Sequence, residues 1–384
     1  MLPSKVEVLV AGGGPTGLVV SSVLRRAGRE VLTLDRQAEG ANASRAAAIH
    51  ARTLEVLDEL EVTDTLVAEG VRVPWFSFRD RDRLLARLEF AELPTRHPFI
   101  LTIQQYRTER ILLEGLRAAG GDVLRPYEVT EVRPDRDGAT VTVLGPDGVE
   151  QVRARFVIGA DGTHSRVRQQ AGISFLGGDY PQSFVLADAV LDEWPLEFDE
   201  VQNFFSPSGI VVSGPLPEKH RRVLTTVDED PAEIDVPFVQ GILDERGPTG
   251  AKVGSLSWTS RFRVHHRVAS TFRLGPVLLA GDAAHVHSPA GGQGMNLGIQ
   301  DAVDLGHTIA DFLTDRAPGE TALDGYEARR KPIAKATVRF TNAMTSASIV
   351  RNRPAQLVRD AMFALAGKLP PVRRRMALHM AELS

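Results

Sequence analysis

The pattern of hydrophobic and polar positions opens with one βαβ unit. Residues 6–11 form a short apolar run that ends in glycines, residues 15–28 carry apolar positions at helical spacing, and residues 31–34 form a second apolar run. A strand, a glycine turn, a helix and a strand within about thirty residues predict a parallel sheet at the start of the chain.

The pattern changes over the next hundred residues. Leucines at helical spacing predict helix within residues 45–70, aromatic and β-branched residues predict strands within 74–103, and residues 106–119 again predict a helix. Alternating positions over residues 129–157, separated by Asp-Gly turns, predict further strands that return to the first sheet.

The second half of the chain again shows short strand-like segments followed by helical patterns. Many short strand-like pieces with Pro and Gly between them lie between about residues 180 and 272, which we interpret as a second, inserted sheet. Residues 276–281 predict another buried strand, followed by a glycine-rich loop and a helix over 293–313. The tail from residue 323 to 384 is mostly helical by pattern, with breaks at Pro354 and Pro370.

These elements predict an α/β fold with two domains. The chain of 384 residues is longer than the roughly 250–300 residues at which single cores stop growing. We expect residues 1–73, 100–180 and 273–384 to form a parallel-sheet domain that includes the helical C-terminal part. Residues 74–99 and 181–272 are expected to form the smaller, mixed α/β sheet domain that interrupts it.

Composition excludes several classes of function. A net charge of -4 argues against binding to nucleic acid, which requires a basic surface. The absence of cysteine excludes disulfides and thiolate chemistry, so redox chemistry would need a bound cofactor. No apolar stretch approaches the roughly 18–20 residues of a membrane span, and the first residues lack the features of a signal peptide, so we expect no membrane span and a cytoplasmic location.

The loop after the first predicted strand carries a dinucleotide-binding pattern. Gly12, Gly14 and Gly17 fit G-x-G-x-x-G, with Pro15 and Thr16 at the start of the helix. Gly12 would make the tight turn, Gly14 would admit a pyrophosphate, and Gly17 would permit close helix packing. The helix N-terminus would stabilise the phosphates through its unpaired N–H groups and its dipole. A purely structural glycine turn is the alternative interpretation.

An acidic residue at the end of the second strand supports the binding interpretation. Asp35 lies where a carboxylate would accept hydrogen bonds from the two ribose hydroxyls. A carboxylate there disfavours a 2′-phosphate, so this site suits FAD or NAD better than NADP.

Two further motifs follow predicted strands. Residues 159–168 (GADGTHSRVR) could form a binding loop or only a turn with a helix N-cap. Residues 279–285 (LAGDAAH) lead into residues 288–296 (SPAGGQGMN), where three glycines within four residues precede a helix. Such a backbone can lie against a flat ring and present N–H groups to it.

Together, in this order, the three motifs resemble those of the class A flavoprotein monooxygenases, the family that includes para-hydroxybenzoate hydroxylase and the polyketide and phenol hydroxylases. The resemblance covers nearly the whole chain. It implies a Rossmann-like FAD-binding domain and hydroxylation of an aromatic or polyketide-like small molecule. It also implies NADPH or NADH and O2 as co-substrates, with oxygen transfer through a flavin C4a-hydroperoxide.

The motifs and the resemblance together give a set of candidate site residues. The resemblance implies that the first motif, with Asp35 and Arg36, holds the ADP half of FAD and that Asp282 holds the ribityl and pyrophosphate side. It also implies that Gln105 touches the flavin chain and that Arg45 lies beside the phosphates and the mobile ring. The predicted cofactor-binding residues are Gly12, Gly14, Pro15, Thr16, Gly17, Asp35, Arg36, Arg45, Gln105, Asp161, Asp282, Gly291, Gly294, Met295 and Asn296.

Pro289 and the backbone at Gly292 are the predicted catalytic elements, as the wall that positions the oxygen transfer. In this family no side chain donates the oxygen atom, and a base for substrate deprotonation is not evident from the sequence. The helix N-terminus near Gly294 would place positive potential at the flavin edge that becomes anionic on reduction.

Several features have a plainer interpretation. His285 and His287 lack a third ligand, so we expect no metal site and a structural, hydrogen-bonding His285. The basic cluster of Lys368 and Arg373 to Arg375 is interpreted as a solvated helix face in preference to a contact with anionic lipid. Ordinary core packing is preferred to substrate stacking for Phe76, Phe78, Phe99, Phe184, Phe204, Phe205 and Phe262.

Alternative functions remain open at this point. An epoxidase, a Baeyer–Villiger oxygenase or a reductase of isoprenoid double bonds could use the same fold. A non-catalytic FAD-binding or sequestration protein is the alternative from another class. We expect a monomer or a homodimer.

Overall fold

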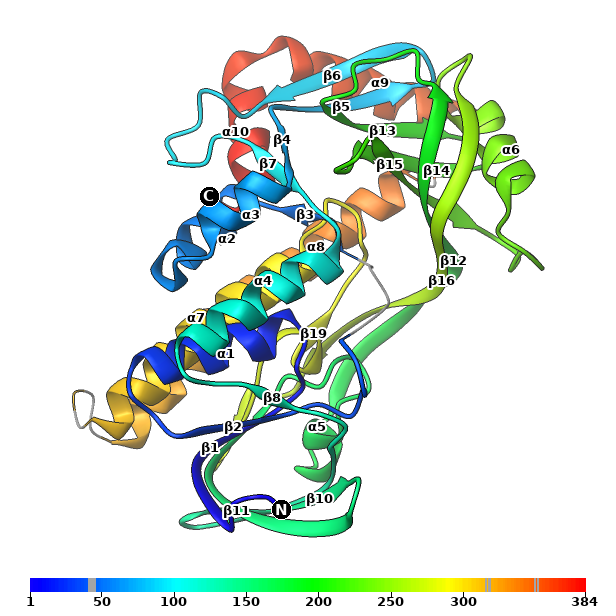
Figure 1. The fold of residues 1–384 in the computed structure, drawn as a ribbon. Helices are drawn as coiled ribbons and strands as arrows, with labels where there is room; N and C mark the ends of the chain where they lie inside the picture. The colour runs from blue at the N-terminus through cyan, green and yellow to red at the C-terminus, as the bar shows by residue number, and fades with distance from the viewer. Residues whose placement is uncertain (41–45, 315, 317–318, 349, 351) are drawn as a thin grey trace.

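The computed structural model describes residues 1–40, 46–314, 316, 319–348, 350 and 352–384 (Figure 1). Arg45, which the sequence places in the cofactor site, lies outside the described residues. Two large sheets lie at opposite ends of the molecule, and helices α1, α4 and α7 lie between them (Figure 1).

The first sheet has a parallel core, as the opening pattern predicts. Strand β1 (Lys5–Ala11) pairs in parallel with β2 (Val31–Leu34) and β11 (Gly148–Gly159). Val8 and Leu9 of β1 are fully buried, because helices and strands cover both faces of a parallel sheet. The other strands of this sheet are β8 (Val123–Leu124), β9 (Glu128–Asp135), β10 (Gly138–Gly145), β17 (Arg273–Leu274) and β18 (Val277–Leu279).

The helices of this part of the chain pack closely against one another. Gly306 on α7 lies so near α1 that an added Cβ would be 2.6 Å from Val23 Cγ1, so a small residue is needed at this crossing. The helices are α1 (Pro15–Arg26), α4 (Gln105–Ala118), α5 (Arg166–Gln170), α7 (Gly294–Leu313) and α8 (Glu320–Ser348).

The second sheet differs from the prediction in one respect. Two of its strands, β12 (Phe175–Glu193) and β16 (Lys252–Ala269), are long and extend from near the first sheet into the second sheet (Figure 1). The sequence predicts short pieces because Gly and Pro interrupt the pattern. In the structure Gly177 and Gly178 pair within the continuous strand β12, and the segment that contains Pro181 is a register shift between Asp179 and Ser183. The other strands are β5 (Trp75–Asp80), β6 (Arg83–Glu89), β13 (Glu200–Ser206), β14 (Gly209–Pro215), β15 (His220–Val227) and β19 (His285–Val286).

A third, small sheet connects the two parts. The region predicted as helix within residues 45–70 contains shorter elements, because Glu61 takes a left-handed conformation with φ 58°. The elements of these segments are β3 (Ala48–Ile49), α2 (Ala51–Leu57), η1 (Asp58–Leu60), α3 (Thr63–Glu69), β4 (Val71–Val73) and β7 (Ile100–Thr102). Two short helices lie elsewhere: α6 (Val236–Arg246) and η2 (Gly281–Ala283).

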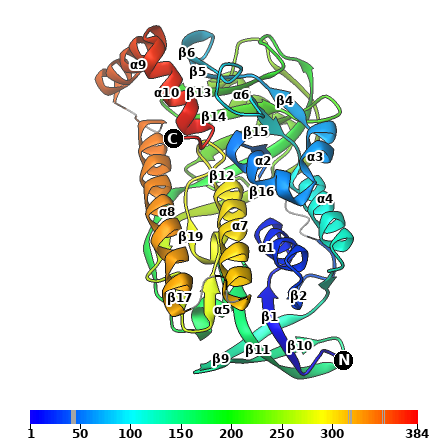
Figure 2. The same ribbon diagram turned by 90° about the vertical axis from the view of Figure 1, so that its left-hand side faces the viewer.

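The C-terminal helices α9 (Arg353–Lys368) and α10 (Pro370–Met380) pack on β6 of the second sheet (Figure 2). Phe363 on α9 lies 4.6 Å from the ring of Phe78. The division of the chain into two domains, with this tail in the first, stays a prediction. None of the helices in the described ranges is both long and apolar enough to cross a membrane.

Candidate active site

The backbone geometry explains in a different way why Gly12, Gly14 and Gly17 of the first motif are glycines. Gly12 follows β1 with φ 110°, and an added Cβ would lie 2.2 Å from the Ala160 carbonyl oxygen. At Gly17 an added Cβ would lie 1.9 Å from the Gly12 carbonyl oxygen. An added Cβ at Gly14 meets no atom within 4 Å, because Gly14 borders a cavity. The loop therefore presents open backbone at the N-terminus of α1, as a pyrophosphate site requires.

Asp35 stands at the end of β2 beside this loop. Its Oδ2 accepts a hydrogen bond from the Gly13 amide at 2.6 Å, and its Oδ1 accepts one from the Gln37 amide at 2.8 Å. Arg125 Nη1 lies 3.7 Å from Asp35 Oδ1. The carboxylate is thus held in place by the backbone while it borders the same cavity as Gly14 and Arg36.

The second motif shows both of the roles that the sequence left open. Asp161 Oδ2 accepts hydrogen bonds from the amides of Arg166 and Val167, so the carboxylate caps the short helix α5. Asp161 also borders the cavity, and its Oδ1 has no partner among the described residues. Burial raises the pKa of this carboxyl above its usual value.

Arg168 connects the second motif to the third. Its guanidinium lies 3.9 Å from the ring centre of Phe175 and donates hydrogen bonds to the carbonyl oxygens of Ala283 and Thr163. Asp282 accepts a hydrogen bond of 3.3 Å from Thr163 Oγ1. The two loops are therefore positioned relative to each other by side chains of the second motif.

The glycine-rich loop of the third motif forms another wall of the cavity. Gly291 and Gly292 take left-handed conformations with φ 82° and 66°, which place the turn directly before α7. Pro289, Gly294 and Met295 border the cavity beside them.

Asn296, which the sequence groups with these residues, does not line the cavity. It is fully buried, accepts a hydrogen bond from the His50 amide at 2.8 Å, and donates to the carbonyl oxygens of Ala48 and Gly292. Gly17 is also absent from the cavity wall, because it packs against Gly12. Asn296 and Gly17 therefore position cavity-lining residues without bordering the cavity themselves.

Gln105 joins the segment after residue 45 to α4. Its Oε1 accepts a hydrogen bond from the Ala46 amide at 2.9 Å, and its Nε2 donates to Glu109 Oε1 at 2.8 Å. Gln105 and Glu109 both border the cavity.

The site contains two histidines that the sequence analysis did not assign to it. His50 was not considered, and His287 was considered only as a metal ligand. His50 Nε2 donates a hydrogen bond to the Gly291 carbonyl oxygen at 2.8 Å, and burial lowers the pKa of this histidine to about 4. His287 borders the cavity, neither of its ring nitrogens has a partner within the described residues, and burial lowers its pKa to about 3. Both rings are therefore neutral at pH 7. A single histidine in a loop carries no sequence signal that distinguishes such a role.

The second sheet contributes an apolar chamber to the same cavity. The whole cavity, including this chamber, has a volume of about 830 Å³. Arg222 lies in its wall, paired with Asp188 by two hydrogen bonds of 2.7 Å. Of the seven phenylalanines weighed from the sequence, Phe76 and Phe262 border the cavity. The apolar lining residues of this chamber include Phe76, Ile100, Leu186, Val201, Val212, Leu224 and Phe262.

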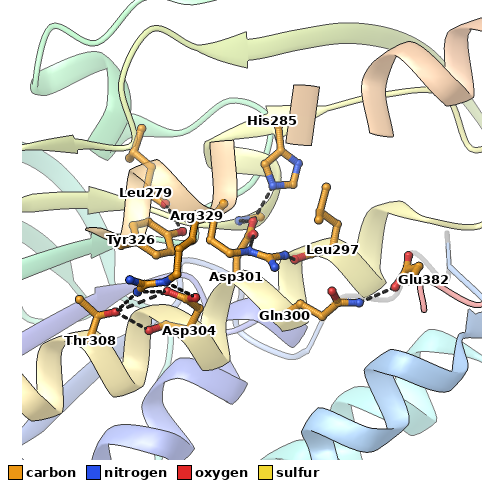
Figure 3. Close-up of polar contacts among 12 residues, drawn as sticks. Leu279, His285, Leu297, Gln300, Asp301, Asp304, Thr308, Tyr326, Arg329 and Glu382 are labelled. Carbon is orange, nitrogen blue, oxygen red and sulfur yellow. Dashed lines mark hydrogen bonds and ion pairs between the residues drawn. The ribbon is translucent and has the colours of Figure 1, made fainter. Parts of the chain in front are cut away.

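A buried ionic network supports the third motif from below (Figure 3). Asp301 on α7 accepts hydrogen bonds from His285 Nε2 at 2.5 Å, Arg330 Nε at 2.6 Å and the Gly281 amide at 3.3 Å. Burial alone would raise the pKa of Asp301, but His285 and Arg330 together lower it below its usual value. His285 is thus a hydrogen-bonded structural residue, as predicted, although its partner is a helix carboxylate.

Comparison with known proteins agrees with this geometry. Residues 5–341 match the family described as "FAD binding domain". A 12-dehydrotetracycline 5-monooxygenase/anhydrotetracycline 6-monooxygenase from Streptomyces rimosus is 38% identical over 352 residues, which are 88% of this chain and 69% of that protein.

Solved structures show the same similarity. An anhydrotetracycline hydroxylase from Streptomyces rimosus has 34% identity and a TM-score of 0.82, over 99% of this chain and 76% of that one. A p-nitrophenol 4-monooxygenase from Pseudomonas putida has 27% identity and a TM-score of 0.87, over 99% of both chains. The chain therefore belongs to the FAD-binding-domain family of class A FAD-dependent aromatic hydroxylases.

Proposed function

We propose that this flavin-dependent monooxygenase hydroxylates a multi-ring, polyketide-like aromatic molecule, with NADPH or NADH and O2 as co-substrates. One observation carries the proposal: a single cavity joins the loops of all three motifs to the apolar chamber of the second sheet. A substrate ring in that chamber would lie within reach of a cofactor held by the loops. Relatives that oxidise tetracycline precursors support a multi-ring substrate.

The residues present fit FAD. Gly14 and the N-terminus of α1 would hold the pyrophosphate, and Asp35 would hold the ribose of the ADP half. Asp282 and Gln105 would hold the ribityl chain, and the loop from Pro289 to Met295 would hold the ring. When bound, FAD would accept electrons from the reduced nicotinamide and activate O2.

The protein itself would supply position, charge and dryness. The N-terminus of α7 would stabilise negative charge on the ring, because its first N–H groups have no helical partner. Pro289 and the Gly292 backbone would form the wall that orients the substrate carbon. The aliphatic side chains of the chamber would exclude water, which protects a reactive oxygen donor from decomposition.

The substrate contacts also have a polar component. Arg222 is held rigidly by Asp188, so its position in the wall is determined before a substrate enters. We assign it to orienting an oxygen substituent of the substrate. The dependence on reduced nicotinamide supports a cytoplasmic location, and a monomer or homodimer stays the expectation for the assembly.

The test combines absorbance with steady-state kinetics. Purified protein is expected to show a flavin spectrum, and a panel of multi-ring phenols is expected to stimulate NAD(P)H oxidation with matching O2 uptake. Product structure then separates hydroxylation from epoxidation and Baeyer–Villiger oxidation. Flavin-containing protein that oxidises no nicotinamide with any substrate would point to the sequestration alternative, and oxidation without O2 uptake would point to a reductase.

A further inference from the structure

Helix α9 carries unusually polar residues on its inward side. Its buried residues are Gln356, Arg359 and Asp360, beside the half-buried Phe363 that packs on Phe78 and Phe205. Arg359 lies 4.4 Å from the ring centre of Phe205, and Asp360 accepts a hydrogen bond of 3.0 Å from Arg83 on β6. A helix in water is expected to show the opposite distribution, with apolar residues inward.

The exposed face of α9 and the start of α10 is apolar. We call it the α9 face; its side chains are between 39% and 68% exposed, and they are Leu357, Val358, Met362, Leu365, Leu369 and Val372. Within α9, Val358, Met362 and Leu365 are spaced by four and three residues, which places them on one side of that helix, and Leu369 and Val372 continue the exposed apolar surface onto the start of α10. In Figure 2, α9 lies at an outer corner of the molecule, far from the N-terminus.

Backbone contact holds this helix in place. An added Cβ at Gly367 would lie 3.0 Å from the Ala86 Cα of β6, so α9 rests directly on the sheet. Turning the apolar side chains inward would require this contact and the Asp360 ion pair to break. The α9 face is therefore a fixed feature of the surface, and contiguous patches of this kind mark interaction sites.

The charges beside the α9 face have one sign. Residues 353–384 contain six Lys and Arg and two Asp and Glu, in a chain whose net charge is -4. Asp360 is buried and the carboxyl of Glu382 is enclosed by Thr53 and Gln300, whereas Lys368, Arg374 and Arg375 are exposed. Within the described residues, none of these three cations takes part in an ion pair.

These charges discriminate between occupants. A second copy that docked by the same face would bring Lys and Arg against Lys and Arg. An aliphatic helix face flanked by Lys and Arg suits the surface of an anionic lipid bilayer.

We propose that the α9 face is a peripheral docking site for anionic membrane lipid. Leu365, Met362 and their neighbours insert among the acyl chains, and Lys368, Arg374 and Arg375 contact the lipid phosphates. The proposal takes up the anionic-lipid alternative that the sequence offered for this basic cluster, because the structure shows the apolar side of α9 facing outward beside it.

The test is co-sedimentation of the flavin-loaded protein with vesicles. Binding is expected to vesicles of phosphatidylglycerol with phosphatidylcholine, and not to phosphatidylcholine alone. It is expected to weaken about fivefold for each of Arg374→Gln and Arg375→Gln. The double variant M362Q/L365Q should weaken it about tenfold. The control is Val149→Gln, which changes a residue 68% exposed on β11 of the other sheet and should have no effect.

Three results would overturn the proposal. One is no binding to phosphatidylglycerol vesicles at low salt. Another is equal loss of binding in V149Q and in M362Q/L365Q. The third is a dimer in size-exclusion chromatography that M362Q/L365Q dissociates, without vesicle binding, which would assign the face to self-association. The flavin spectrum of each variant shows that it is folded.

Discussion

His285 Nε2 lies 2.5 Å from Asp301 Oδ2 in the interior of the protein, and Asp301 also contacts Gly281, the neighbour of Asp282. Asp301 also receives a hydrogen bond from Arg330 and one from the Gly281 amide. One carboxylate of α7 therefore connects β19, α8 and the turn after β18. The position of the third motif depends on a residue that does not itself border the cavity.

The first prediction concerns this carboxylate. Asp301→Asn leaves the buried Arg330 without its counter-charge, which typically costs about 3–5 kcal/mol. Urea unfolding should show this loss, and fluorescence titration should show weaker FAD binding. The matched control is Asp304→Asn on the same helix, since Asp304 pairs with the half-exposed Arg329 and should cost about 1 kcal/mol or less. Equal losses in the two variants would contradict the prediction.

The second prediction separates two glycines of the first motif. Gly17→Ala forces a Cβ against the Gly12 carbonyl oxygen, so both stability and FAD binding should fall. The added Cβ of Gly14→Val meets no protein atom within 4 Å, so the unfolding free energy should stay within about 1 kcal/mol while FAD binding is lost. Thermal unfolding of the apoprotein and FAD titration measure the two effects. FAD binding by G14V with unchanged affinity would exclude a pyrophosphate from that position.

The third prediction is a pH dependence. Glu382 is buried beside α2 and α7, and burial raises its pKa to about 8, so it is protonated in the folded protein at pH 7. An unfolded glutamate loses its proton near pH 4.5. The unfolded state therefore binds fewer protons between about pH 4.5 and 8, and stability contributed by this group falls as the pH rises through that window.

Glu382→Gln removes this proton and keeps the shape of the side chain. The difference in unfolding free energy between E382Q and the parent should shift in favour of E382Q by about 1 kcal/mol per pH unit between pH 5 and 8. Urea unfolding at several pH values measures the slope. A difference that does not change with pH would show that Glu382 ionises normally.

The fourth prediction concerns the apolar chamber. Val212→Trp fills part of the chamber from β14, which carries none of the three motifs, so FAD binding and basal NAD(P)H oxidation should remain. Formation of hydroxylated product from a multi-ring phenol should fall by about tenfold or more, and a single-ring phenol should be affected less. Leu84→Trp, at an exposed position on β6, is the control. An unchanged product yield would place the substrate elsewhere.

The local pattern of the sequence was sufficient for the parts that depend on neighbouring residues. The βαβ unit, the loops of the three motifs and the helix over residues 293–313 follow from apolar periodicity and from glycine positions. Gly12 and Gly17 could be assigned because a tight turn restricts the backbone over a few residues. The family resemblance rests on the same local features.

Only the tertiary structure decided which side chains face the cavity. Asn296 and Met295 are adjacent in the sequence, yet Asn296 points into the protein and Met295 borders the cavity. His50 meets Gly291 across 241 residues, and such a contact leaves no periodic signal. Helix α9 shows the reason most clearly: a hydrophobic stripe predicts a buried face, but what covers it depends on distant parts of the chain, and here the sheet covers the opposite side.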